Sequence, residues 1–87
     1  MNGMLVDSSV MKIFGFKDLK TFHQKLVDWG AFYWSNGRIY PEREFGLMAP
    51  IEFEYRSHRR VIWFAPWAVD FVEHCKIITE NKLVDHE

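Results

Sequence analysis

The stretch GFKDLKTFHQKLVDWGAFYWSNGRIYP, Gly15 to Pro41, decides the fold that this chain of 87 residues is expected to adopt. Its first half predicts a helix from about Lys17 to Trp29, because apolar residues recur there at spacings of three and four and so share one face. Gly30 stands where a helix-ending glycine belongs. The apolar face consists of Leu19, Phe22, Leu26 and Trp29.

The opposite face of this helix is polar along its whole length. Lysine and glutamine are residue types that reach phosphates and base edges, so the face predicts a recognition helix for DNA. The same pattern also fits an ordinary solvated helix face. This face, called the polar stripe below, consists of Lys17, Lys20, Thr21, Gln24 and Asp28.

The second half of the stretch predicts a β-hairpin around Asn36-Gly37, the preferred pair for a type I′ turn. This turn pairs Ser35 with Arg38, and the residues on either side follow in register. The alternation of the strands places one set of side chains in the core, namely Phe32, Trp34 and Ile39. It places the other set outside, namely Tyr33, Arg38 and Tyr40.

The residues before this stretch predict a short strand over 4–7 and a short helix from 10 to 14. Ser8 and Ser9 are candidate caps for that helix, and Gly15 would end it. Two helices joined by only two or three residues must cross steeply, as in a helix-turn-helix.

A second hairpin is predicted downstream, after a connection over 42–50 with a turn near Gly46. Ile51 to Arg56 alternates apolar and charged residues, and Arg60 to Phe64 is its expected partner, with a turn of two or three residues between them. The cations at this turn would form a wing that holds the DNA backbone, although charged residues also protect the edges of sheets. This basic tip consists of Arg56, His58, Arg59 and Arg60.

A final helix is expected to open at Pro66 and close the core, with Trp67 at its edge and residues 82–87 frayed. Its buried stripe would consist of Ala68, Phe71, Val72, Cys75 and Ile78.

Composition limits the class of protein. A chain of this length forms one domain, and a hydrophobic content of 48% with 17% aromatic residues favours a folded chain over a disordered one. The single cysteine allows no internal disulfide, which suits a reducing cytosol. Residues 1–64 carry nine lysines and arginines against seven acids, whereas residues 65–87 carry two against five. This asymmetry permits a local basic patch.

No catalytic motif stands out, so we expect a protein that is not an enzyme and that uses no cofactor or metal. The four histidines are scattered, and Asp70, His74 and Cys75 lack a second pair of ligands at zinc spacing. No secretory signal is evident, and no apolar run is long enough to span a bilayer, so no membrane contact is expected.

Taken together, these elements predict an α+β fold over residues 1–87, namely a winged-helix-like domain with a helix-turn-helix, β-hairpins and a closing helix. The segments LKTFHQKLVDWG and AFYWSNGRIY, and the later APWA running into VDFVEHC, resemble the KilAC-type C-terminal domain of phage antirepressor proteins. The resemblance covers about residues 8–78. It departs from the family pattern at Ala65 and Ala68, where the family has a capping threonine and a glycine.

The resemblance implies a phage or prophage regulatory module that acts in the cytoplasm of a bacterial host cell. We expect it to bind DNA through the polar stripe, with Lys17, Lys20, Thr21 and Gln24 as the recognition residues, and through the basic tip. The alternative is an antirepressor or small phage inhibitor that binds a repressor or host regulatory protein without DNA. Its contacts would be Tyr33, Arg38, Tyr40 and Trp67. A homodimer is compatible with either interpretation.

Overall fold

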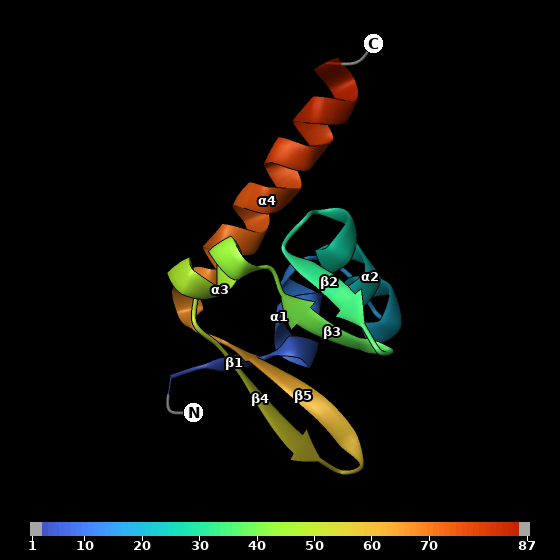
Figure 1. Ribbon diagram of the computed structural model, residues 1–87, viewed down its shortest axis with the longest axis vertical. Helices are drawn as coiled ribbons and strands as arrows, with labels where there is room; N and C mark the ends of the chain where they lie inside the picture. Colours follow the sequence, from blue (N-terminus) through green and yellow to red (C-terminus); the bar gives the residue numbers. More distant parts are fainter. Residues whose placement is uncertain (1–2, 86–87) are drawn as a thin grey trace.

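A three-stranded antiparallel sheet and a separate two-stranded hairpin are joined by four helices in the computed structural model, which describes residues 3–85 (Figure 1). The α+β class is therefore confirmed. The helices are α1 (Asp7–Ile13), α2 (Leu19–Asp28), α3 (Arg43–Met48) and α4 (Pro66–Asp85). The strands are β1 (Leu5–Val6), β2 (Phe32–Ser35), β3 (Arg38–Pro41), β4 (Ile51–Arg56) and β5 (Arg59–Phe64).

The larger sheet has the order β1-β5-β4, so its first strand pairs with its last. The register of β4 and β5 is Ile51 opposite Phe64 and Arg56 opposite Arg59. The turn between them therefore contains two residues, Ser57 and His58, whose φ angles are 52° and 63°. The alternative three-residue turn is wrong, and Arg59 belongs to the strand.

The corner between α1 and α2 differs from the expectation in its details. Helix α1 begins at Asp7 after Val6, which makes no side-chain cap, so Ser8 and Ser9 lie inside the helix and do not cap it. Gly15 follows the helix with a φ of 83°, as a helix-ending glycine does. Five residues, 14–18, separate the helices, more than the two or three expected.

Aromatic rings fill this corner. Phe14 and Phe16 pack against both Phe22 and Trp29, with ring centroids 5.7–6.1 Å apart. The connection is therefore anchored by packing even though it is longer than a tight turn. The predicted apolar face of α2 is confirmed, because Phe22, Leu26 and Trp29 are buried.

The first hairpin has the predicted register, with Ser35 opposite Arg38 and Trp34 opposite Ile39. Asn36 and Gly37 have φ angles of 51° and 73°, as a type I′ turn requires. Phe32 and Ile39 are buried as expected, but Trp34 keeps 43% of its surface exposed. The expectation that Trp34 lies in the core is wrong, because its indole N–H reaches the exposed side chain of Gln24 on α2, to which it donates a hydrogen bond.

The segment between the hairpins is partly helical, which the expected connection did not include. Helix α3 places Phe45 in the core, where its ring lies 5.4 Å from Phe32 and 5.8 Å from Phe71. It thereby joins the first hairpin to α4. The glycine at 46 prevented a clear helical prediction.

Helix α4 opens at Pro66 as predicted and extends away from the body of the protein (Figure 1). Ala68 and Val72 are buried, and Phe71 and Cys75 are half-buried, but Ile78 is 40% exposed. The predicted burial of Ile78 is therefore wrong, because this part of the helix contacts the body through the neighbouring residue Thr79, whose hydroxyl donates to the backbone carbonyl of Trp29 at 3.1 Å. The helix includes Lys82 and continues to Asp85, and the expected fraying of residues 86–87 lies outside the described residues.

Candidate nucleic-acid interface

The polar stripe begins at a capped helix end. Asp18 precedes α2, and its carboxylate accepts hydrogen bonds from the backbone N–H and the hydroxyl of Thr21, both at 2.8 Å. These bonds to Thr21 lower the pKa of Asp18. The start of α2 is thereby fixed, and the hydroxyl hydrogen of Thr21 is already donated within the protein.

Gln24, in the middle of the stripe, is held from two sides. Its amide nitrogen donates to Asp28 at 2.9 Å, and its amide oxygen accepts from the indole N–H of Trp34 at 3.1 Å. A donor on one side and an acceptor on the other assign the orientation of the amide. Gln24 is thus a pre-oriented group, with one N–H and one lone pair left for a ligand.

The lysines of the stripe are the charges that remain available on it. Lys17 and Lys20 are exposed, and within residues 3–85 neither forms an ion pair. The expectation that Lys17 lies on the recognition helix is wrong, because the helix is capped by Asp18 and begins at Leu19. Beside the stripe lies an open hollow with a cavity volume of about 350 Å³. Its lining residues are Lys20, Thr21, Gln24, Lys25 and Trp34.

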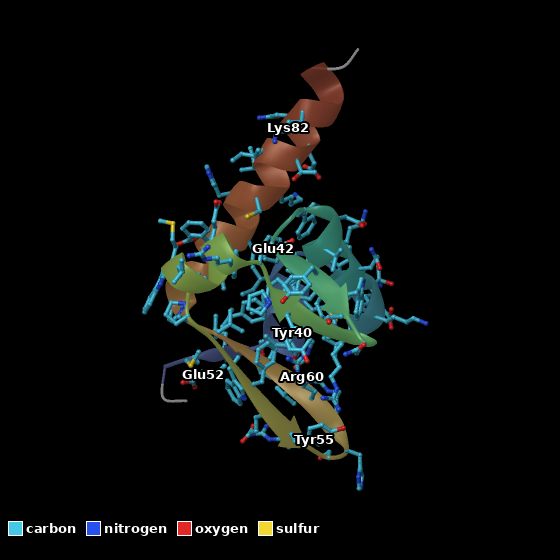
Figure 2. The ribbon with its side chains drawn as sticks, viewed as in Figure 1. Tyr40, Glu42, Glu52, Tyr55, Arg60 and Lys82 are labelled. Carbon is cyan, nitrogen blue, oxygen red and sulfur yellow. The ribbon has the colours of Figure 1, made fainter. Side chains whose placement is uncertain are left out.

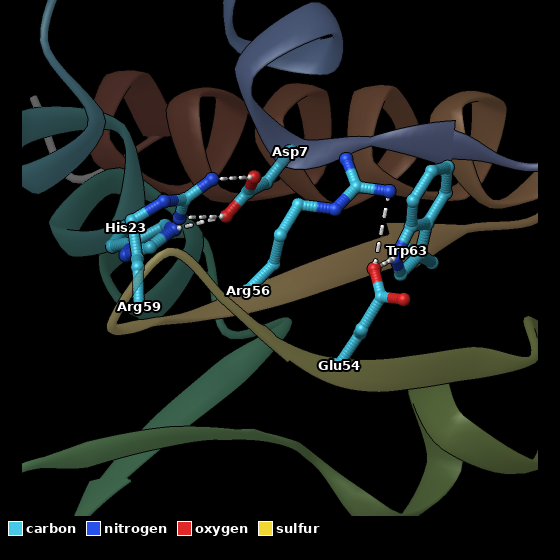
Figure 3. A network of polar contacts seen from close by, with 6 residues as sticks. All are labelled: Asp7, His23, Glu54, Arg56, Arg59 and Trp63. Atoms are coloured by element: carbon cyan, nitrogen blue, oxygen red, sulfur yellow. Dashed lines mark hydrogen bonds and ion pairs between the residues drawn. The ribbon is translucent and has the colours of Figure 1, made fainter.

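The basic tip is arranged differently, because Arg59 points into the protein. Its guanidinium donates to both carboxylate oxygens of Asp7, at 2.9 and 3.1 Å, and His23 of α2 lies 3.1 Å from the same carboxylate (Figure 3). Asp7 is fully buried. Burial alone would raise the pKa of Asp7, but the hydrogen bonds from His23 and Arg59 outweigh it and lower the pKa. Arg59 therefore links β5 to α1, and Asp7 links both to α2.

Arg60 leaves the other side of β5 and lies between the two hairpins, beside Tyr40 (Figure 2). Its guanidinium carbon is 3.7 Å from the ring centre of Phe53 and 4.5 Å from that of Tyr40, and it donates to the backbone carbonyl of Ile39. Burial lowers the pKa of Arg60, although an arginine stays charged at neutral pH. Arg60 therefore connects the two hairpins through these contacts.

Arg56 and His58 are the exposed residues of the basic tip. Arg56 lies 3.4 Å from Glu54 and 5.5 Å from the ring centre of Trp63, whose indole N–H also donates to Glu54 (Figure 3). The expectation that all four tip residues crowd an open tip is therefore wrong for Arg59 and Arg60. The part that the tip residues take in DNA binding stays a prediction.

The residues of the alternative protein-binding surface come from separate elements. Tyr33, Arg38 and Tyr40 belong to the first hairpin, where the two tyrosine rings stack with centroids 6.0 Å apart. Trp67 lies in the first turn of α4 and is 54% exposed. These four residues do not come from one continuous element.

Sequence reasoning missed three contributors to these sites. Asp7 stood at the end of an expected strand, and only the fold shows that it meets Arg59, 52 residues away. Trp34 was assigned to the core. Lys25 lies one position after Gln24, outside the stripe, and joins the hollow only because the hairpin folds back against α2. The tryptophan two residues before Asn36 was the one feature of the sequence that could have indicated an exposed aromatic side chain near the turn.

A second hollow lies between α3 and α4, with a cavity volume of about 580 Å³. Phe45 and Phe71 line it, together with His74 and Cys75. Burial raises the pKa of the Cys75 thiol. Within residues 3–85, no three His, Cys, Asp or Glu side chains are grouped so that they could hold a metal ion.

No helix in the described part of the chain combines the length and the apolar character that crossing a membrane requires. No protein-family model matches the chain, and comparison with curated proteins and with solved structures gives no significant match.

Proposed function

We propose that this protein is a DNA-binding regulatory module that uses a winged-helix-like scaffold and presents α2 to the major groove. The order of elements supports the scaffold, since β1, α1 and α2 precede a β4–β5 hairpin that pairs with β1. The first hairpin and α3 are then insertions between the recognition helix and the wing. The resemblance to the phage antirepressor domain points to the same kind of module.

The observation that carries the proposal is that the lysines of the polar stripe are exposed and unpaired within residues 3–85. The apolar face of α2 is buried, while Lys17 and Lys20 stay exposed and without ion pairs within residues 3–85. Lys20 on the open face of α2, together with Lys17 just before the cap of that helix, can meet phosphates, and Gln24 is placed to meet a base edge. The wing would add a weaker contact through Arg56 and His58.

Fluorescence anisotropy with mixed genomic DNA fragments, at low and at physiological salt, tests the proposal. We expect affinity that falls steeply with salt and keeps a sequence-selective remainder. Lys17→Ala with Lys20→Ala should reduce the salt slope by about two phosphate contacts. The matched control is Lys76→Ala with Lys82→Ala, which removes two charges from α4 and should leave the slope unchanged (Lys82 is labelled in Figure 2). Absence of binding at low salt would refute DNA binding.

A protein partner is the second candidate, favoured by the apolar side chains exposed on α3 and α4. Leu47 is 74% exposed, Met48 61% and Trp67 54%. Met48 also lines the hollow between α3 and α4. Large exposed apolar side chains are typical of a protein-binding surface. A pulldown from bacterial lysate that depends on Leu47 and Met48, with no DNA binding, would favour this function.

A further inference from the structure

The side chain of Trp34 is both exposed and fixed. It keeps 43% of its surface open, yet its indole N–H is bound to Gln24 at 3.1 Å. An exposed tryptophan on a strand would ordinarily exchange rotamers. The bond to α2 instead holds this ring at the edge of the hollow, in one orientation, before any ligand arrives.

The hollow beside the ring combines two kinds of surface. Its walls are mainly apolar, and the two lysines that belong to its lining, Lys20 and Lys25, bring positive charge to its edge. An aromatic ring next to positive charge is the arrangement by which proteins hold single-stranded nucleic acid, since bases stack on the ring and phosphates meet the cations. Gln24 adds one free N–H and one free lone pair at the same place.

We infer that this hollow, formed by Trp34, Gln24, Lys20 and Lys25, is a binding subsite for one unpaired nucleotide of DNA. The base stacks on the indole of Trp34, the flanking phosphate lies against Lys20 and Lys25, and the free edge of the Gln24 amide meets the base edge. This inference rests on the proposed DNA binding by α2 and adds the class of DNA that is preferred.

The inference requires an unpaired base, because in a continuous duplex both faces of each base are covered by its neighbours. A ring can stack only on a base that has left the duplex or was never paired. The preferred ligand is therefore a duplex with a bulge or a single-stranded junction. In such a ligand the polar stripe holds the duplex while Trp34 holds the unpaired base.

The test compares three probes at one salt concentration by anisotropy. They are a perfect duplex, the same duplex with one unpaired thymine, and the single strand alone. We expect the wild-type protein to bind the bulged duplex more tightly than the perfect duplex. Trp34→Leu should abolish this preference and weaken binding of the bulged probe by about tenfold or more. Trp34→Phe keeps a ring and should keep most of the preference.

The matched control is Trp67→Leu, which makes the same change at an exposed tryptophan of α4 and should leave all three affinities unchanged. Equal binding of the perfect and bulged duplexes by the wild-type protein would overturn the subsite and leave the proposed function intact. So would a preference that persists in Trp34→Leu. Failure to bind any probe at low salt would overturn the proposed function, and the subsite with it.

Discussion

The polar stripe at α2 and the basic tip of the β4–β5 hairpin both carry cations, two lysines in the first and three arginines in the second, but use them differently in the folded protein. Lys17 and Lys20 extend into solvent, whereas Arg59 and Arg60 contact a buried carboxylate and two aromatic rings. The difference follows from side-chain chemistry. A guanidinium is planar, weakly hydrated and able to bind a carboxylate with two bonds, whereas an ammonium is compact and strongly hydrated. Arg59 and Arg60 are therefore held within the structure, whereas Lys17 and Lys20 stay available.

The largest effect on stability should come from breaking the ion pair between Arg59 of the basic tip and the buried Asp7. Arg59→Ala leaves Asp7 buried beside His23 alone, and we expect a loss of about 3 kcal/mol in the free energy of unfolding. Urea denaturation followed by circular dichroism measures it. A loss below about 0.5 kcal/mol, as is typical of surface substitutions, would show that Arg59 is not structural.

A smaller effect is expected from Arg60→Met, which keeps a long side chain but removes the charge between the two hairpins. The cation–π contacts with Phe53 and Tyr40 and the bond to Ile39 would be lost, at a cost of about 1–2 kcal/mol. The same denaturation experiment applies. An unchanged or raised stability would mean that packing of the stem alone holds the hairpins together.

Acid should lower the free energy of unfolding by protonating Asp7, the partner of Arg59. The pKa of Asp7 lies below its usual value of 3.8, so the unfolded chain binds more protons than the native protein as the pH approaches that value. The stabilisation is therefore complete above about pH 5 and is lost as the pH falls through the native pKa. Asp18 also has a lowered pKa, so the measurement belongs in an Asp18→Asn background. Stability that stays flat down to pH 3 in this variant would contradict the assignment.

The smallest change is expected at the exposed end of the tip. Arg56 has a partner in Glu54, but both side chains are open to solvent, and such pairs contribute little. Arg56→Ala should therefore lower the free energy of unfolding by less than about 1 kcal/mol. A loss as large as that of Arg59→Ala would remove the distinction between the two ends of the tip.

The sequence predicts local features well and long-range contacts poorly. The helix of the polar stripe, the Asn36-Gly37 hairpin and the opening of α4 at Pro66 depend on neighbouring residues, and all three are confirmed. The pairing of Asp7 with Arg59 and the closure of Trp34 onto Gln24 depend on how elements meet. No periodicity encodes these contacts, so the number of cations at a turn did not reveal which of them are free.

The comparison between the two basic regions is tested most directly by the salt dependence of DNA binding. Anisotropy titrations would compare the wild type with Lys17→Ala plus Lys20→Ala and with Arg56→Ala plus His58→Ala, both of which change exposed residues only. The account predicts a slope reduced by about two contacts for the first variant and by at most about one for the second. A larger reduction for the second variant would place the main DNA contact on the basic tip and contradict the account.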